Sequence, residues 1–139
     1  MRTIVVPVVD SSAGKRALEL AKADAAATGA KLVLVGAATI SGRVVKNIEA
    51  VQRYLTELEK ELADQGFDCV TEWAVGESLG DVTLRAAEEH DADLITMGLR
   101  RRSQVGKALL GSYEQEVLLD APCPVLSVAE QLGEAFGRD

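Results

Sequence analysis

Histidine, cysteine and aromatic side chains are scarce in this chain. Its 139 residues include one histidine, two cysteines and 4% aromatic residues. Because His90 is the single histidine, a histidine-rich metal site is excluded, and the spacing of Cys69 and Cys123 matches no metal-binding motif. Two cysteines in a chain of this size also argue against a disulfide framework. We therefore expect no metal site built from protein ligands.

Long apolar runs and an excess of positive charge are absent as well. No stretch approaches the roughly 20 consecutive apolar residues of a membrane span. The first apolar run, 4–9, ends at Asp10 and lacks the form of a secretory leader. The net charge of −7 opposes binding to the phosphate backbone of nucleic acids. We expect a cytoplasmic protein that binds neither membranes nor nucleic acids.

The chain is rich in alternating apolar runs and helical patterns. Its 47% hydrophobic and 27% charged residues are typical of one globular domain, here residues 1–139. Apolar runs predict buried strands at 3–9, 31–38, 69–75, 92–97 and 125–129. Helical periodicity predicts helices between Asp10 and Thr28, over 48–62, over 82–90, and from Ser112 onward. The alternation predicts an α/β fold: a doubly wound, five-stranded parallel sheet with helices on both faces.

Residues suited to element ends support these boundaries. Pro7 cannot donate to a strand ladder, so it has to lie near the end of its strand. Asp10-Ser11-Ser12 offers helix caps, and glycines 29 and 66 are suited to end helices. Ser112-Tyr113-Glu114-Gln115 has the form of a capping box, in which Ser112 caps the last helix and Gln115 reaches back toward it.

The stretch from Gly98 to Ser112 carries the clearest functional signal. It contains four cationic side chains and no acidic one, and it connects a predicted strand with a predicted helix. Free N–H groups and the dipole at a helix N-terminus favour phosphate. In doubly wound sheets, ligands bind beyond the carboxyl ends of the strands, where the strand order reverses. We interpret the stretch as an anion-binding loop; a solvated basic loop is the alternative.

Two other motifs do not fit the chemistry they suggest. Gly76-Glu77-Ser78-Leu79-Gly80 matches the nucleophile elbow of hydrolases. However, His90 lies at the far end of the helix that follows, so Ser78 lacks a base, and we interpret the motif as a turn with Ser78 or Asp81 as helix cap. Gly106-Lys107 is followed by alanine and therefore fails the P-loop pattern. No Gly-x-Gly-x-x-Gly follows the first strand.

Motifs along nearly the whole chain resemble the universal stress protein family. They are Ile4-Val5-Val6-Pro7-Val8, Arg16-Ala17-Leu18, residues 86–90, and the C-terminal segments 92–103, 110–112 and 121–128. The resemblance implies a five-stranded sheet of order 3-2-1-4-5 and a homodimer joined along strand 125–129. It also implies, for many members, a bound ATP or related adenine nucleotide, with Mg²⁺ as a candidate companion of the nucleotide.

The chain keeps part of the family's nucleotide motif and departs from the rest. Nucleotide-binding members carry Gly-x2-Gly-x9-Gly-Ser/Thr and an aspartate two residues after the first-strand proline. Gly98, Gly111 and Ser112 match this pattern. Arg101 replaces the middle glycine, while Val9 replaces the aspartate and Asp10 follows one residue late. An arginine adds bulk where phosphate would approach, but it also offers a permanent charge and five donors.

The resemblance implies roles for individual residues. Gly98, Gly111 and Ser112 would contact phosphate, and Ala37 would contact adenine through its backbone. Arg100 and Arg101 are candidate charge partners. The other candidates for the nucleotide site are Pro7, Val8, Val9, Asp10, Met97 and Tyr113.

Two interpretations of function stay open at this point. The first is a dimeric cytoplasmic stress protein that binds an adenine nucleotide. The second is a universal stress protein whose pocket is blocked and which acts by binding an unknown protein partner. An ATP-hydrolysing enzyme is disfavoured, because no general base or pair of metal-binding carboxylates is visible near the basic loop. We assign no catalytic residue.

Overall fold

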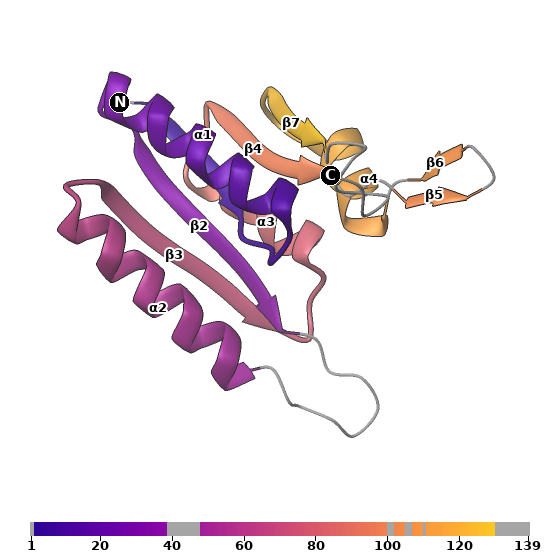
Figure 1. Cartoon of the computed structure of the whole chain (residues 1–139), viewed down its shortest axis with the longest axis horizontal. Coiled ribbons are helices and arrows are strands. Elements are labelled where there is room, and N and C mark those ends of the chain that lie inside the picture. Colours follow the sequence, from indigo (N-terminus) through magenta and orange to yellow (C-terminus); the bar gives the residue numbers. More distant parts are fainter. Residues whose placement is uncertain (1, 39–47, 100–101, 105–106, 110, 130–139) are drawn as a thin grey trace, which may run out of the picture.

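The fold is described from a computed structural model, which covers residues 2–38, 48–99, 102–104, 107–109 and 111–129. Strands and helices alternate along the chain, as the sequence predicts (Figure 1). The elements are β1 (Thr3–Pro7), α1 (Ser12–Thr28), β2 (Lys31–Ala38), α2 (Ile48–Asp64), β3 (Asp68–Val75), α3 (Leu79–Glu89), β4 (Leu94–Leu99), β5 (Arg102–Gln104), β6 (Lys107–Leu109), α4 (Ser112–Asp120) and β7 (Val125–Ala129).

Five parallel strands form the central sheet in the order β3-β2-β1-β4-β7. This confirms the predicted fold class and strand order. The chain passes from β1 to β2 on one side and places β4 on the other, so the order reverses between β1 and β4. A ligand site of a doubly wound sheet belongs beyond the carboxyl ends of these two strands.

Helices cover both faces of the sheet, which explains why the strands read as continuous apolar runs. On one face, Ile4 and Val6 pack with alanines of α1 and leucines of α2. On the other face, Val5 packs with residues of α3 and α4. Pro7 is the last residue of β1, and the ladder continues only through the Val8 N–H, which donates to the Val35 carbonyl at 2.8 Å.

The N-caps of α1 and α3 agree with the sequence prediction, whereas that of α4 does not. Ser11 caps α1 by accepting from the Gly14 N–H at 3.0 Å, and Ser78 caps α3 by accepting from the Asp81 N–H at 3.0 Å. The N-cap of α4 is Gly111, and no side-chain hydrogen bond caps this end. The prediction that Ser112 is the cap is therefore wrong by one position, because Gly111 already has the extended backbone of a cap.

The basic stretch contains regular structure that the sequence analysis did not predict. β5 and β6 pair in antiparallel fashion, with Arg102 opposite Leu109, and form a separate sheet that projects from the main one (Figure 1). The prediction of a plain loop is thus wrong for 102–104 and 107–109. A strand of three residues is too short for the alternation of its side chains to be recognised in the sequence.

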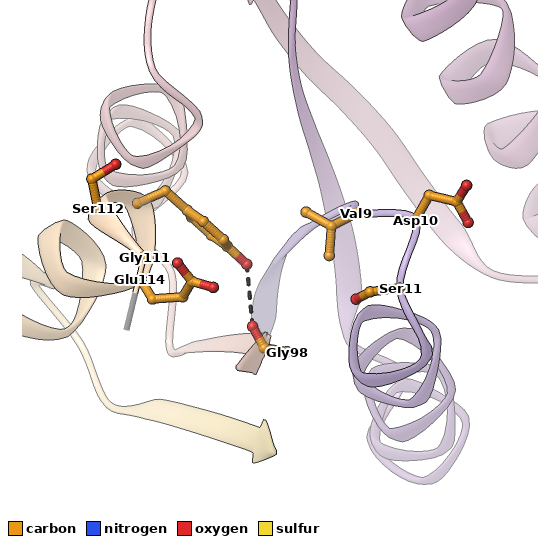
Figure 2. Close-up of a pocket in the computed structure, with 8 residues that line it drawn as sticks. Val9, Asp10, Ser11, Gly98, Gly111, Ser112 and Glu114 are labelled. Atoms are coloured by element: carbon orange, nitrogen blue, oxygen red, sulfur yellow. Dashed lines mark hydrogen bonds between the residues drawn. The ribbon is translucent and has the colours of Figure 1, made fainter. Parts of the chain in front are cut away.

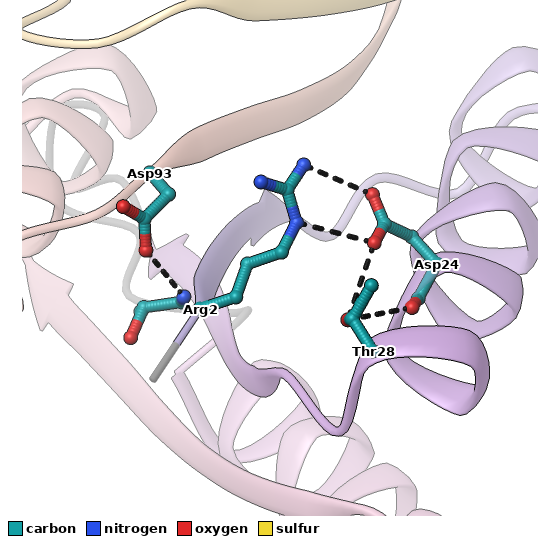
Figure 3. A network of polar contacts seen from close by, with 5 residues as sticks. Arg2, Asp24, Thr28 and Asp93 are labelled. Carbon is teal, nitrogen blue, oxygen red and sulfur yellow. Dashed lines mark hydrogen bonds and ion pairs between the residues drawn. The ribbon is translucent and has the colours of Figure 1, made fainter.

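A polar network ties the starts of the strands together at the edge opposite the carboxyl ends (Figure 3). The Arg2 guanidinium binds the Asp24 carboxylate through two contacts of 3.2 Å, and the Thr28 hydroxyl donates to the Asp24 carbonyl at 2.8 Å. Asp93 exchanges two bonds of 2.8 Å with the Thr3 backbone. Since Thr3 begins β1 and Asp93 precedes β4, this pair fixes the strands that flank the reversal point.

Among the described residues, no helix is long and apolar enough to cross a membrane.

Substitutions test the assignment of Ser11 as the cap of α1 and of Gly111 as the cap of α4. Ser11→Ala should lower the free energy of unfolding by about 1 kcal/mol, because it leaves the Gly14 N–H without its acceptor. Ser112→Ala should change it by less than about 0.5 kcal/mol, because the exposed Ser112 is not the cap of α4. Urea denaturation of the two variants and the wild-type protein measures both values. A loss for Ser112→Ala as large as that for Ser11→Ala would contradict the assignment of Gly111 as the cap.

Candidate functional site

A cavity of about 290 Å³ opens where the strand order reverses (Figure 2). Three segments that are far apart in the sequence meet there: the turn after β1, the end of β4 and the first turn of α4. The residues that line it are Val9, Asp10, Ser11, Gly98, Gly111, Ser112, Tyr113 and Glu114. The reversal point thus brings together six of the residues predicted from the sequence, namely Val9, Asp10, Gly98, Gly111, Ser112 and Tyr113.

A second cavity, of about 430 Å³, shares Asp10 with the first. It lies between the ends of β1 and β2 and the first turns of α2. Apolar residue types predominate among the residues that line it, which are Val8, Asp10, Ala37, Ala50, Val51, Tyr54 and Leu55. Val8 and Ala37, two more of the predicted residues, therefore face a cavity next to the first one rather than the first one itself.

Gly98 is required by the packing of the backbone. A Cβ atom at this position would lie 2.6 Å from the carbonyl carbon of Ala13 and 2.6 Å from the nitrogen of Gly14. Real Cβ atoms essentially never approach so closely, so only glycine allows the first turn of α1 to rest on β4. The sequence analysis linked this glycine to phosphate, and the structure gives it a further role in setting the floor of the cavity.

Val9 and Asp10 point in different directions. The Val9 side chain is half-buried and faces the cavity, where it packs over Gly14 (Figure 2). The Asp10 side chain points away from Gly98 and Glu114, is 92% exposed, and pairs with Lys15 across 3.5 Å. The one-residue offset of the aspartate thus places a methyl-bearing side chain in the first cavity and a carboxylate at its junction with the second.

Tyr113 closes the cavity between α4 and β4. Its hydroxyl donates to the carbonyl oxygen of Gly98 at 3.3 Å, the bond drawn as a dashed line in Figure 2. Burial raises the pKa of Tyr113 well above its ordinary value, and the neighbouring charge of Glu114 raises it further. The phenol is therefore neutral and acts as a hydrogen-bond donor at physiological pH.

Of the residues that line the first cavity, Ser11 and Glu114 were not predicted as site residues, and Glu114 adds a carboxylate to the site. Glu114 is buried, with an exposed fraction of 6%. Its carboxylate lies over Gly111, where a Cβ atom would collide with it. No hydrogen bond or ion pair to this carboxylate is found within the described part of the chain. A sequence signal for Glu114 exists, because an acidic residue three positions after a helix cap folds back toward the cap. The signal points to Glu114 only when the cap is Gly111, and the sequence had predicted Ser112 as the cap.

Pro7 and Met97 are not among the residues that line either cavity. Pro7 ends β1, and the Met97 side chain is fully buried in the core behind the site. Arg100 and Arg101 lie outside the described residues.

The Gly-x-Ser-x-Gly motif serves the packing of two helices. The Ser78 hydroxyl donates to Glu116 of α4 at 3.2 Å, and a Cβ atom on Gly80 would lie 2.9 Å from the Glu116 carboxyl carbon. His90 lies between Glu72, at 2.8 Å, and Lys31, at 3.5 Å. Ser78 therefore has a carboxylate as its partner instead of the histidine that a hydrolase requires.

The two thiols lie away from both cavities and are free. Burial raises the pKa of Cys69 to about 12, with the charges of Glu59 and Asp68 adding to the effect, and burial also raises the pKa of Cys123. Such thiols are poor nucleophiles at neutral pH. No group of three or more potential metal ligands occurs among the residues that the structure describes.

Comparison with known proteins agrees with this architecture. The model of the universal stress protein family matches residues 1–129. A universal stress protein of Thermus aquaticus, named for its place beside a sulfhydrylase gene, is 36% identical over 134 residues, which is 91% of this chain and 98% of that protein.

Solved structures give the same result. The structure of a universal stress protein from Archaeoglobus fulgidus has a TM-score of 0.77 at 28% identity and covers 92% of this chain and 98% of its own. A universal stress protein solved in complex with cAMP has a TM-score of 0.68 at 26% identity, with coverage of 91% and 96%. With its reversal-point cavity, its strand order and a family match over nearly its whole length, this chain belongs to the universal stress protein family.

Proposed function

We propose that this protein binds an adenine nucleotide, with the base in the second cavity and the phosphate side directed toward the first turn of α4. The observation that carries the proposal is the junction of the two cavities at Asp10. One cavity is lined mostly by residues with apolar side chains and lies beside a strand end, and the other lies at a helix N-terminus. A ligand with a flat apolar base at one end and an anion at the other fits this pair.

The end of β2 offers the base both a donor and an acceptor. The Val35 carbonyl faces β1, since it accepts from Val8, and the Ala38 carbonyl faces β3, since it accepts from the Gly76 N–H at 2.8 Å. Backbone groups alternate in direction along a strand, so the N–H and C=O of Ala37 face the β1 side. Because β1 ends at Pro7, opposite Val35, these groups have no partner strand there among the described residues. An adenine edge pairs with one donor and one acceptor.

The N-terminus of α4 supplies the other half of the site. The first backbone N–H groups of a helix have no partner within the helix, and the helix dipole adds positive potential there. Gly111 and Ser112 expose this end to the first cavity. Mg²⁺ would arrive with the phosphates of the ligand, as the described residues hold no cluster of metal ligands.

The proposed role is binding without catalysis, in a cytoplasmic response to stress. A hydrolase needs a base beside its nucleophile, and Ser78 is instead held by Glu116. A relative of this fold has been solved in complex with cAMP, which supports an adenine ligand for the site.

Filling the second cavity tests the placement of the base. Ala50 lines that cavity from the exposed side of α2, so Ala50→Trp should block it without entering the core. Calorimetric titration with adenosine and AMP should show saturable binding to the wild-type protein, weakened about tenfold or more in Ala50→Trp. Gln52→Trp, on an exposed position of the same helix outside both cavities, is the matched control and should bind as the wild type does.

Failure of adenosine and AMP to bind at millimolar concentration would contradict the proposed function. Equal binding by Ala50→Trp and Gln52→Trp would contradict the position of the base. If adenosine and AMP do not bind, the recognition of a protein partner becomes the candidate function.

We also propose that β7 joins two copies of the chain. β7 is the last strand of the sheet order and pairs with β4 alone among the described strands. An unpaired edge strand is normally covered in native proteins. Leu126 on this strand is 45% exposed, whereas Val125 packs against the core.

Light scattering over a dilution series should therefore give twice the mass of one chain at micromolar concentration. Leu126→Lys should shift the protein toward the monomer, since it places a charge in the interface while leaving the core intact. Leu20→Lys is the control, because Leu20 is similarly exposed, at 47%, but lies on α1. A wild-type monomer, or equal dissociation of both variants, would contradict a dimer along β7.

A further inference from the structure

We propose that Glu114 is a built-in anion that makes the site select adenosine or AMP over adenine nucleotides with two or three phosphates. This inference rests on the proposed adenine-binding function and narrows its ligand class. It comes from the placement of one buried carboxylate at the point where a phosphate would bind.

Glu114 lies on the inner side of the first turn of α4. Figure 2 shows its carboxylate directed from α4 toward Val9 and Gly98, while the Ser112 hydroxyl points away from it. The carboxylate lines the cavity at the reversal point and covers the cap residue Gly111. It therefore takes the place where the helix N-terminus would receive an external anion.

Glu114 combines near-complete burial of the residue with a place on the wall of the first cavity. The residue is 6% exposed, and the described residues provide its carboxylate with neither an ion pair nor a hydrogen bond. The hydroxyl of the adjacent Tyr113 donates to the Gly98 carbonyl. The charge of Glu114 does act on Tyr113, whose pKa it raises in addition to the larger effect of burial. The positive end of α4 favours a carboxylate at this place.

One helix N-terminus cannot serve two anions equally well. A phosphate that enters the first cavity meets a carboxylate of the same sign in a poorly screened position, and the repulsion grows with each added phosphate charge. Adenosine carries no such charge and can occupy the second cavity alone. AMP places one phosphoryl group near Asp10 and the mouth of the first cavity. A triphosphate has to extend to Gly111, where Glu114 lies.

The test compares ligands that differ only in phosphate content. Calorimetric titrations use adenosine, AMP, ATP and inorganic triphosphate against the wild-type protein, Glu114→Gln and Asp120→Asn. Glu114→Gln keeps the shape of the side chain and removes the charge. Asp120→Asn removes an exposed charge from the other end of α4 and controls for net charge. Thermal unfolding of each variant confirms that it is folded.

Removal of the Glu114 charge should raise the affinity for ATP and for inorganic triphosphate about tenfold or more, with a change of less than about twofold for adenosine. Asp120→Asn should leave the ratio of ATP to adenosine affinity as it is in the wild-type protein. Wild-type protein that binds ATP more tightly than AMP, or a Glu114→Gln variant without gain for ATP and triphosphate, would overturn the proposal.

Failure of the proposed function is a separate outcome. It would appear as the absence of adenosine binding to the wild-type protein and to both variants. Inorganic triphosphate reports on the α4 N-terminus without any base, so a gain in Glu114→Gln would still identify Glu114 as the excluding anion, and no gain would still overturn that role.

Discussion

The direct contact between the first turn of α1 and β4 is the constraint on which the site depends. With glycine at position 98, the backbone of Ala13 and Gly14 rests on the strand without an intervening side chain. That contact places Val9 and Ser11, which precede α1, beside the end of β4. Tyr113 then reaches the Gly98 carbonyl from α4. One close approach of backbone to backbone thus brings the three cavity-forming segments together.

The electrostatics of the site depend more on the N-terminus of helix α4 than on ion pairs between side chains. α4 presents its positive end to the cavity and has a glycine cap without a side-chain bond. Glu114 supplies the acidic group that this end favours, and Asp10 remains in solvent with Lys15. A basic sequence near a pocket does not show which charge faces the pocket.

Both corrections to the sequence analysis concern choices between neighbouring local structures. Gly111 and Ser112 are both acceptable N-caps by residue type, and the one-residue difference decided whether Glu114 was seen as a surface residue or as part of the site. The pairing of β5 with β6 was missed because each strand has three residues. The longer signals were correct: the apolar runs gave the buried strands, and Ser11, Ser78 and Gly29 mark helix ends where predicted.

The sequence by itself determined the fold class and the N-caps of α1 and α3, because these depend on periodicity and on residue types that act within a few positions. The strand order came from the family resemblance. The sequence also named most residues that meet at the reversal point. Tertiary structure alone decided that Gly98 serves the approach of α1, that Asp10 lines both cavities whereas Val9 lines only the first, and that the Glu114 carboxylate lies over Gly111. These facts depend on distances between segments up to about a hundred residues apart, which no local pattern encodes.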